Sequence, residues 1–223
     1  MFDRIAVRYD LMNRVLSLGS DVRWRHRMVA ALGSPAPRSV LDLATGTGDV
    51  ACLVARRLAR AEVVGLDPSE GMLAVARQKA RVRGLGDRVH FVGGDAEALP
   101  FESASFDAVT MAFGIRNVPD RRRAVGEMRR VLRPRGRALV LELCEPQGHL
   151  LSPLVRLWNR QVMPRLGALV GAADAYAYLD RSIRAFPPAA VFAATLRDAG
   201  FAAVRFERLS FGAAALFVAD APA

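Results

Sequence analysis

A glycine-rich loop between an apolar run and a helical pattern is the first place in this chain where residue types and spacing point to chemistry. The apolar run covers residues 39–44, the helical pattern begins at Val50, and the loop between them reads Thr45-Gly46-Thr47-Gly48-Asp49. Glycines at such a junction let backbone N–H groups and the positive end of a helix meet a polar or anionic ligand without interference from a Cβ atom. The spacing Gly46-x-Gly48-x-x-Ala51 also satisfies the dinucleotide-binding fingerprint. The loop therefore predicts a site for a nucleoside-type cofactor, and a plain strand-to-helix turn is the alternative.

Three acidic residues stand in or just after three successive apolar runs. Asp67 lies 19 residues beyond Gly48, at the end of the second run, where a carboxylate accepts hydrogen bonds from ribose hydroxyls. Asp42 lies inside the first run, where it would repel a pyrophosphate but could hold the ammonium group of a methionine moiety. Asp95 and Ala96 follow the third run, a natural place to bind an adenine amino group. These positions favour S-adenosylmethionine over a nicotinamide cofactor, although Asp42 as a helix-capping acid and Asp95 as a turn residue stay open.

The elements that must position these residues alternate between strand and helix patterns. We expect strands at 39–44, 61–67, 88–92, 106–112 and 137–143, and helices at 50–61, 69–83 and 120–132. Strands with continuous apolar cores, separated by helices, are typical of a parallel sheet that is covered on both faces. A further helix at 189–198 precedes two strands, 200–206 and 210–218, close enough to form a hairpin at one sheet edge. The prediction is a Rossmann-like α/β fold with a seven-stranded, mostly parallel sheet.

The chain is expected to form a single domain with four parts. Residues 1–34 form an N-terminal helical cover, whose helix over 21–32 is capped by Ser20 and stopped by Gly33. Residues 35–146 form the cofactor-binding core, residues 147–187 a helical insertion, and residues 188–223 the C-terminal helix and edge hairpin. The insertion carries an apolar stripe from Leu151 to Leu169 at helical spacing.

Composition excludes several classes of protein. Two cysteines and three histidines, none of them clustered, predict neither a disulfide framework nor a metal site. No run approaches the roughly 18 to 20 apolar residues of a membrane-spanning helix, and the start is no secretory signal, so we expect a cytoplasmic protein. The net charge is +10, and Lys79 is the single lysine among the basic residues. This excess invites anionic partners such as nucleic acid, phosphorylated metabolites or a membrane surface, unless it reflects base composition.

Several further segments extend these observations. The glycine loop is generic, but the segments Tyr9-Asp10-x-Met12-Asn13 and Phe113-Gly114-Ile115-Arg116-Asn117-Val118 are much more specific. On these motifs the chain resembles the class I methyltransferases and, more narrowly, the ubiquinone/menaquinone biosynthesis C-methyltransferase family. The resemblance covers almost the whole chain.

The resemblance implies a methyl donor and an acceptor. The donor is S-adenosylmethionine, bound through Thr47, Asp67, Asp95 and Ala96, while Ala112 stands where the family often has serine and its backbone can still serve. The acceptor is a polyprenylated quinol methylated on carbon: foremost demethylmenaquinol, in the last step of menaquinone biosynthesis. The benzoquinol precursor of ubiquinone, or another small molecule, is the alternative. The complete set that we expect around the donor is Asp42, Thr45, Gly46, Thr47, Gly48, Asp67, Asp95, Ala96 and Ala112.

Methylation of a ring carbon requires an activated ring held against the donor. Arg116 and Asn117 follow the fourth strand, and we expect them to orient the ring oxygens, with a structural pairing of Arg116 to Asp10 or Asp120 as the alternative. The resemblance places Tyr9 and Asp10 over the site, where Asp10, or a water that it holds, is the candidate base. Displacement at a sulfonium needs no metal.

An acceptor with an isoprenoid tail implies contact with a membrane. The stripe from Leu151 to Leu169 suits a tail groove or an interfacial helix, and Arg121, Arg122 and Arg123 suit a lipid-facing patch. We therefore expect peripheral association with the inner face of the membrane. The same stripe could instead pack on the sheet or on a second subunit, which leaves a homodimer open. A nucleic-acid partner is not expected: such a partner predicts basic and aromatic side chains clustered so as to stack bases, whereas the run Arg121, Arg122 and Arg123 has no tyrosine or tryptophan beside it.

Overall fold

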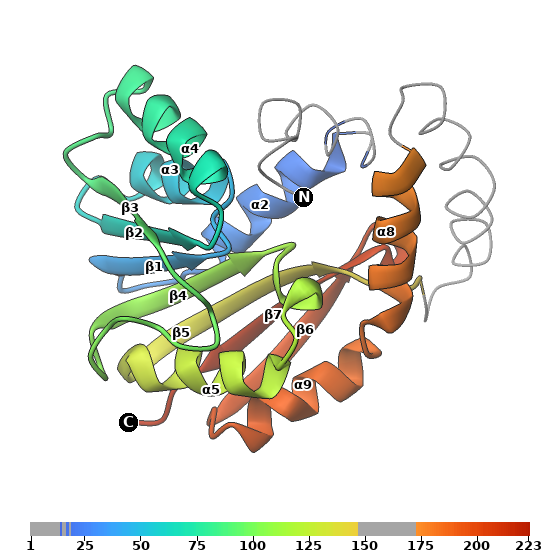
Figure 1. The fold of residues 1–223 in the computed structure, drawn as a ribbon. Coiled ribbons are helices and arrows are strands. Elements are labelled where there is room, and N and C mark those ends of the chain that lie inside the picture. Colours follow the sequence, from blue (N-terminus) through green and yellow to red (C-terminus); the bar gives the residue numbers. More distant parts are fainter. Residues whose placement is uncertain (1–13, 15–16, 18, 147–172) are drawn as a thin grey trace.

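The computed structural model describes Arg14, Ser17, residues 19–146 and residues 173–223. Within these residues seven strands form one sheet in the order β3-β2-β1-β4-β5-β7-β6 (Figure 1). The first five strands pair in parallel, whereas β7 is antiparallel to both β5 and β6. The mostly parallel seven-stranded sheet predicted from the sequence is confirmed. Its strands are β1 (Ser39–Leu43), β2 (Glu62–Asp67), β3 (Val89–Gly93), β4 (Phe106–Ala112), β5 (Leu132–Leu143), β6 (Ala203–Leu209) and β7 (Ala214–Asp220).

Helices cover both faces of this sheet. The helices α2, α3 and α4 pack on one face, and α5 and α9 pack on the other, while α8 lies toward one end of the strands (Figure 1). Two short 3₁₀ turns, η2 and η4, follow β4 and β6. Their bounds are α2 (Ser20–Ala30), α3 (Asp49–Arg57), α4 (Glu70–Val82), η2 (Ile115–Asn117), α5 (Arg121–Val131), α8 (Ala173–Ala185), α9 (Ala189–Asp198) and η4 (Ser210–Gly212).

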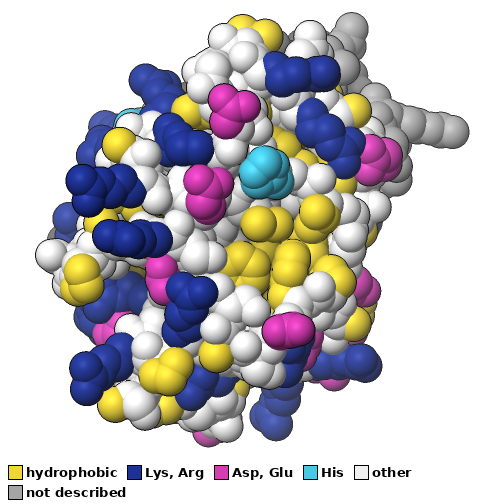
Figure 2. Space-filling view, turned by 90° about the vertical axis from the view of Figure 1, so that its left-hand side faces the viewer, with side chains coloured by type: hydrophobic (Ala, Val, Ile, Leu, Met, Phe, Trp, Pro, Cys, Tyr) yellow, Lys and Arg dark blue, Asp and Glu magenta, His cyan; other side chains and the backbone are white. Residues whose placement is uncertain are grey.

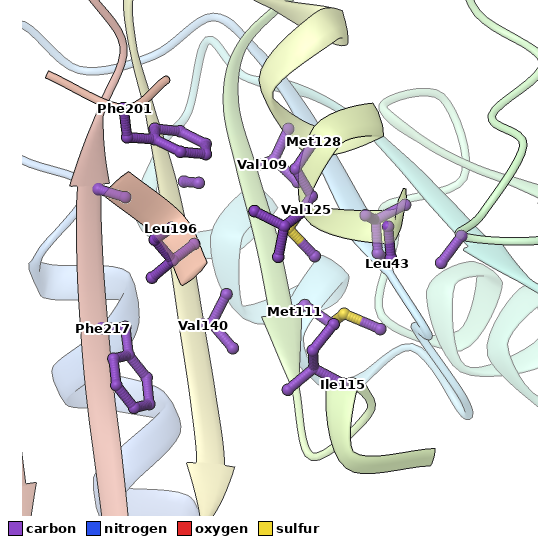
Figure 3. Close-up of a cluster of buried hydrophobic side chains, with 14 of the residues drawn as sticks. Leu43, Val109, Met111, Ile115, Val125, Met128, Val140, Leu196, Phe201 and Phe217 are labelled. Carbon is purple, nitrogen blue, oxygen red and sulfur yellow. The ribbon is translucent and has the colours of Figure 1, made fainter. Parts of the chain in front are cut away.

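The sheet divides the hydrophobic core into two halves. Successive residues of a strand point to opposite faces, so Leu139 of β5 packs toward α2 and α3 while Val140 packs toward α5 and α9. Figure 3 shows the second half, in which Met128 of α5 and Leu196 of α9 lie against the strands. Burial on both faces explains why these strands read as continuous apolar runs.

Several predicted boundaries differ from the structure. Ser20 does not cap α2: Gly19, with φ of 74°, occupies the N-cap position without a side-chain hydrogen bond, and Ser17 Oγ accepts from the Asp21 N–H at 3.3 Å instead. The last two strands begin at Ala203 and Ala214, later than predicted; for β7 the reason is that the η4 turn occupies the first residues of the expected strand.

The cover and the insertion are described only in part. The stripe from Leu151 to Leu169 lies outside the described residues, and α8 is the described end of the predicted insertion. The division into four parts within one domain stays a prediction. None of the helices that the structure describes combines the length and the apolar character needed to cross a membrane.

Candidate functional site

A cavity of about 300 Å³ opens where β1, β2 and β4 end and α3 begins. This edge of a parallel sheet is where open α/β folds bind their ligands. The cavity brings together most of the predicted site, including eight of the nine residues expected around the donor and one of those expected around the acceptor: Asp42, Thr45, Gly46, Thr47, Asp67, Asp95, Ala96, Ala112 and Asn117.

Gly48 is the predicted donor residue that does not line the cavity. It forms the N-cap of α3 with φ of 78°, and a Cβ atom there would lie 2.9 Å from the Phe91 ring. Gly46 has φ of 55° and open space where a Cβ atom would stand. The two glycines therefore have different roles. Gly48 lets α3 pack on the sheet, and Gly46 leaves the backbone accessible from the cavity.

Asp67 ties the glycine loop to the end of β2. Its Oδ2 accepts from the Gly46 N–H and its Oδ1 accepts from the Ser69 N–H, both at 2.9 Å. The side chain is 8% exposed and faces the cavity. Since each carboxylate oxygen can accept more than one hydrogen bond, Asp67 can fix the loop and still accept from a ligand hydroxyl.

Asp42 lies fully buried at the wall of the cavity. Its carboxylate accepts from the hydroxyls of Thr45, at 2.6 Å, and Thr110, at 2.7 Å. Burial raises the pKa of Asp42 to about 6, against the lowering effect of these hydroxyls and of the Ala51 N–H in the first turn of α3. Asp42 thus lines the cavity, whereas the N-cap position of α3 belongs to Gly48 and shows no side-chain cap hydrogen bond.

Lys79 and Asp49 hold the glycine-rich loop in place through hydrogen bonds. Lys79 Nζ of α4 donates to Thr47 Oγ1 at 2.8 Å and to Asp49 Oδ1 at 2.9 Å. Burial by itself raises the pKa of Asp49, but the neighbouring Lys79 ammonium and Arg25 guanidinium hold that pKa below its ordinary value. Asp49 is therefore ionised and offsets both cations.

Arg25 of α2 is a cavity residue that the sequence analysis missed. Its Nη1 donates to Asp21 Oδ2 and lies 3.8 Å from Asp49 Oδ2, and its guanidinium lies 5.4 Å from the centre of the Phe113 ring. The side chain is 8% exposed. The i, i+4 spacing from Asp21 to Arg25 was the available signal, but it does not tell which face of α2 meets the cavity.

Asp95 and Ala96 lie at the far end of the cavity from α2. Asp95 Oδ1 accepts from the Glu97 N–H at 2.9 Å, which is the turn that the sequence left open as an alternative. Asp95 is exposed and Ala96 is buried, and both line the cavity. The turn therefore presents these residues to the cavity without excluding a ligand.

On the acceptor side the structure separates Asn117 from Arg116. Asn117 lines the cavity, and Tyr178 of α8 donates a hydrogen bond to its Oδ1 at 3.1 Å. Arg116 is absent from the described lining and forms a buried ion pair with Glu142, from Nη1 to Oε1 at 2.8 Å. The sequence did not indicate Glu142, because it lies 26 positions away on β5.

The alternatives for these residues are resolved in part. A pairing of Arg116 with Asp120 is wrong, since the Asp120 side chain caps α5 by accepting from the Arg123 N–H. Tyr9 and Asp10 lie outside the described residues, so their roles stay predictions.

Arg121, expected in a solvated or lipid-facing patch without a structural role, does have such a role. Its Nη2 donates to the Arg116 carbonyl at 3.0 Å, its Nε donates to the Ile115 carbonyl at 3.3 Å, and its guanidinium lies 5.7 Å from the centre of the Phe186 ring. Arg121 therefore stabilises the η2 turn. Its neighbours Arg122 and Arg123 are exposed, and Arg123 Nε donates to the Glu97 carbonyl at 2.8 Å.

No three His, Cys, Asp or Glu side chains among the described residues are grouped as metal ligands would be. Figure 2 shows the face on the left of Figure 1, where lysine and arginine side chains are interspersed with acidic ones and hydrophobic side chains gather near the centre.

Comparison with known proteins covers the whole chain. A family model described as the ubiE/COQ5 methyltransferase family matches residues 1–220. The chain is 49% identical over 223 residues to the demethylmenaquinone methyltransferase of Thermus thermophilus, and the match covers 100% of both chains. It is 44% identical over 217 residues to the ubiquinone/menaquinone biosynthesis C-methyltransferase UbiE of Syntrophotalea carbinolica, covering 97% of this chain and 91% of that one.

A solved structure agrees in fold. A SAM-dependent methyltransferase from Thermotoga maritima superposes with a TM-score of 0.68 at 21% sequence identity, covering 98% of this chain and 97% of that one. At this identity the likeness concerns the fold alone.

Proposed function

The chain belongs to the ubiE/COQ5 methyltransferase family, and we propose that it methylates a ring carbon of a polyprenylated quinol with S-adenosylmethionine as donor. The favoured acceptor is demethylmenaquinol, which becomes menaquinol in the last step of menaquinone biosynthesis. The observation that carries this choice is the 49% identity with the Thermus thermophilus demethylmenaquinone methyltransferase over the full length of both chains. The second candidate acceptor is the benzoquinol precursor of ubiquinone, favoured by the 44% identity with UbiE of Syntrophotalea carbinolica.

The chemistry of the cavity fits this donor. Asp67 faces the cavity at the end of β2, where a carboxylate accepts from ribose hydroxyls, and Asp95 with Ala96 stands where the adenine amino group would bind. The open space at the Cα atom of Gly46 lets a ligand approach the backbone. Asp42, next to the start of α3, would face the cationic part of the donor.

The bound donor supplies an electrophilic methyl group on a positively charged sulfur. In the proposed reaction an electron pair of the ring carbon would form the new carbon–carbon bond, the electrons of the carbon–sulfur bond would stay on sulfur, and the ring proton would pass to the proposed base, Asp10 or a water that it holds. Loss of the proton from a ring hydroxyl makes that carbon more nucleophilic. The protein must therefore position the ring and stabilise charge on its oxygen.

Asn117 is the described residue best placed for that task. It lines the cavity, and the hydrogen bond from the Tyr178 hydroxyl to its Oδ1 leaves the amide N–H₂ group to donate to a quinol oxygen. Arg116 would act on the acceptor only through the position of the η2 turn, because its guanidinium is engaged by Glu142. Asp10, or a water that it holds, remains the proposed base, and Tyr9 a proposed contact to the ring.

The acceptor also decides where the enzyme would work. A quinol with an isoprenoid tail resides in the bilayer, so the proposed location is the cytoplasmic side of the membrane with peripheral contact. The segment that includes the Leu151 to Leu169 stripe is the proposed tail-binding or membrane-contacting part. A homodimer through the same stripe is the alternative arrangement.

Incubation with labelled S-adenosylmethionine tests the proposal. The purified protein is given chemically reduced demethylmenaquinone in one reaction and the benzoquinol precursor of ubiquinone in another, and the labelled lipid is identified by mass. We expect label in menaquinol, with less or none in the benzoquinol product. Preferential labelling of the benzoquinol would overturn the choice of acceptor, and absence of label from both lipids would overturn the function.

Two variants separate loss of the site from general damage. Asp67→Asn removes a carboxylate that faces the cavity, and we expect labelling to fall at least tenfold. Asp87→Asn removes an exposed carboxylate outside the cavity, and we expect labelling to stay unchanged.

A further inference from the structure

We infer that Arg25 binds the carboxylate of the amino acid part of S-adenosylmethionine, so that helix α2 completes the donor site. This inference deepens the proposed function, since it depends on that donor. The charges around the cavity support it. Among the described lining residues the carboxylates belong to Asp42, Asp49, Asp67 and Asp95, whereas Arg25 supplies the one guanidinium. The donor carries a sulfonium, an ammonium and a single carboxylate, so a predominantly acidic cavity needs a cation at one place only.

The contacts of Arg25 leave donor capacity on the cavity side. A guanidinium has five N–H donors, and the one hydrogen bond of Arg25 found among the described residues runs from Nη1 to Asp21. Within the part of the chain that the structure describes, no fully buried side-chain nitrogen lacks a partner, so Nε and Nη2 of Arg25 are in contact with open space. Arg25 is only 8% exposed and lines the cavity, so the space that these nitrogens meet is the cavity.

The guanidinium is also held in one orientation. Asp21 anchors Nη1 from the same helix, Asp49 lies 3.8 Å away at the start of α3, and the Phe113 ring packs 5.4 Å from the guanidinium carbon. A preorganised fork of this kind suits bidentate recognition of a carboxylate. The N-terminus of α3, a nine-residue helix capped by Gly48, stands beside it and adds backbone N–H groups that favour negative charge.

Asp42 completes the arrangement on the other side. Arg25 lies close enough to lower the pKa of Asp42 through its charge, and Asp42 lines the same cavity. An α-amino acid places its carboxylate and its ammonium on one carbon. The inferred pairing puts the carboxylate on Arg25 and leaves the ammonium for Asp42, which satisfies both charges together.

A pair of ligands that differ in the amino acid part tests the inference without an acceptor. S-adenosylhomocysteine carries the carboxylate and the ammonium, whereas 5′-methylthioadenosine carries neither. Calorimetry with Arg25→Met should show a loss of affinity for S-adenosylhomocysteine of about 10- to 100-fold, as expected for hydrogen bonds between charged groups. The affinity for 5′-methylthioadenosine should stay within about twofold. Equal losses for both ligands, or no loss for either, would overturn the inference.

Two further proteins control for folding and for general charge effects. Arg23→Met removes an exposed arginine from the same helix and should leave both affinities unchanged. Arg25→Lys keeps the charge without the fork and should lose part of the affinity for S-adenosylhomocysteine alone.

If Arg25→Met does not fold, decarboxylated S-adenosylmethionine provides the same comparison in the wild-type protein and in Arg25→Lys. Removal of the carboxylate should weaken binding to the wild type strongly and binding to Arg25→Lys less. Equal weakening in both proteins would contradict the inference. All of these measurements concern donor analogues, so a failure of quinol methylation leaves them interpretable, and their failure leaves the methylation assay intact.

Discussion

At the scale of single residues, the donor site depends on carboxylates in unequal surroundings. Asp42 is fully buried between two threonine hydroxyls, and its pKa is raised to about 6, while Asp49 lies between two cations and its pKa is lowered. The two acids therefore respond to pH in opposite directions. Ionisation of Asp42 lowers the free energy of unfolding, whereas ionisation of Asp49 raises it.

Replacement of Asp42 by asparagine is expected to change how stability depends on pH. As pH rises, the unfolded chain releases the Asp42 proton near its ordinary pKa of 3.8, whereas the folded protein holds that proton up to about pH 6. The contribution of Asp42 is therefore fully present below about pH 4 and falls by roughly 3 kcal/mol as pH rises past 6. Asp42→Asn lacks this fall. The free energy of unfolding of the variant, measured relative to that of the wild type, should therefore rise by roughly 3 kcal/mol between pH 4 and pH 7.

Urea unfolding of both proteins at pH 4, 5, 6 and 7 measures this difference. The other acids titrate alike in both proteins and cancel, and Asp87→Asn, with an exposed acid replaced, should run parallel to the wild type. Parallel curves for Asp42→Asn and the wild type would show that folding does not shift the pKa of Asp42.

Lys79 is the one lysine in a chain whose other basic residues are arginines, and it bridges Thr47 and Asp49 beneath the donor loop. Lys79→Met removes the two hydrogen bonds that the ammonium donates to Thr47 and Asp49, and we expect a loss of about 2 kcal/mol in the free energy of unfolding. Affinity for S-adenosylhomocysteine should fall at the same time. Lys79→Arg should restore the affinity only in part, because a planar guanidinium does not fit the place of a compact ammonium.

Calorimetry and urea unfolding check both quantities. Arg81→Met is the matched control, because Arg81 is exposed on the same helix. If Lys79→Met behaves like this control, the bridge has no role in holding the loop.

At the scale of elements, buried polar contacts fix how the turns sit on the sheet. The η2 turn, which carries Asn117 to the cavity, is held by Glu142 of β5: its oxygens accept from the backbone N–H of Arg116 at 3.1 Å and from the guanidinium at 2.8 Å. Glu142 is fully buried. The position of Asn117 therefore depends on an ion pair that lies outside the described lining of the cavity.

Glu142→Gln is expected to cost about 3 to 5 kcal/mol in the free energy of unfolding, because it removes the carboxylate from a buried ion pair with Arg116. The matched control is Glu70→Gln, which removes the partner of Arg77 in an ion pair whose acid is 71% exposed. That change should cost no more than about 1 kcal/mol. Equal urea midpoints for the two variants would refute the structural role of Glu142.

At the scale of the whole molecule, much of the arginine excess is used within the fold. Arg88 Nη1 donates to the Ala55 carbonyl at 2.9 Å, Arg130 Nη1 to the Phe101 carbonyl at 2.7 Å, and Arg137 Nη1 to the Ala31 carbonyl at 3.1 Å. Each of these contacts ties a loop or helix end to another element. Several of the guanidiniums that contribute to the net charge of +10 therefore stabilise the fold, whether or not others attract an anionic partner.

The C-terminal strand joins the two parts of the sheet, and the core behind it depends on Phe217. This ring is fully buried, with the Phe192 ring of α9 centred 4.9 Å away and the Phe206 ring of β6 centred 5.7 Å away. Phe217→Ala should cost about 3 to 5 kcal/mol through lost burial and the cavity left behind. Val82→Ala, at a side chain that is 81% exposed, should change the free energy of unfolding by no more than about 0.5 kcal/mol. A cost below 1 kcal/mol for Phe217→Ala in urea unfolding would mean that β6 and α9 do not rely on this ring.

The sequence by itself determined what depends on short stretches of chain. Apolar runs, helical periodicity and glycine spacing located β1 to β4, the donor loop and α9, and the acids after successive strands met at one sheet edge because parallel strands end together. Asp120 and Ser69 begin their helices where the pattern predicted. These features are set by neighbours within a few residues.

Only the tertiary structure decided which distant side chains meet. Arg25 reaches the cavity because α2 packs beside α3, Lys79 reaches Thr47 across 32 positions, and Glu142 captures Arg116 across 26. The local sequence around each of these residues fits a solvent-exposed helix or an ordinary strand equally well. Their roles follow from how the helices dock on the sheet, a choice made by packing over the whole core and by the need to pair every buried charge.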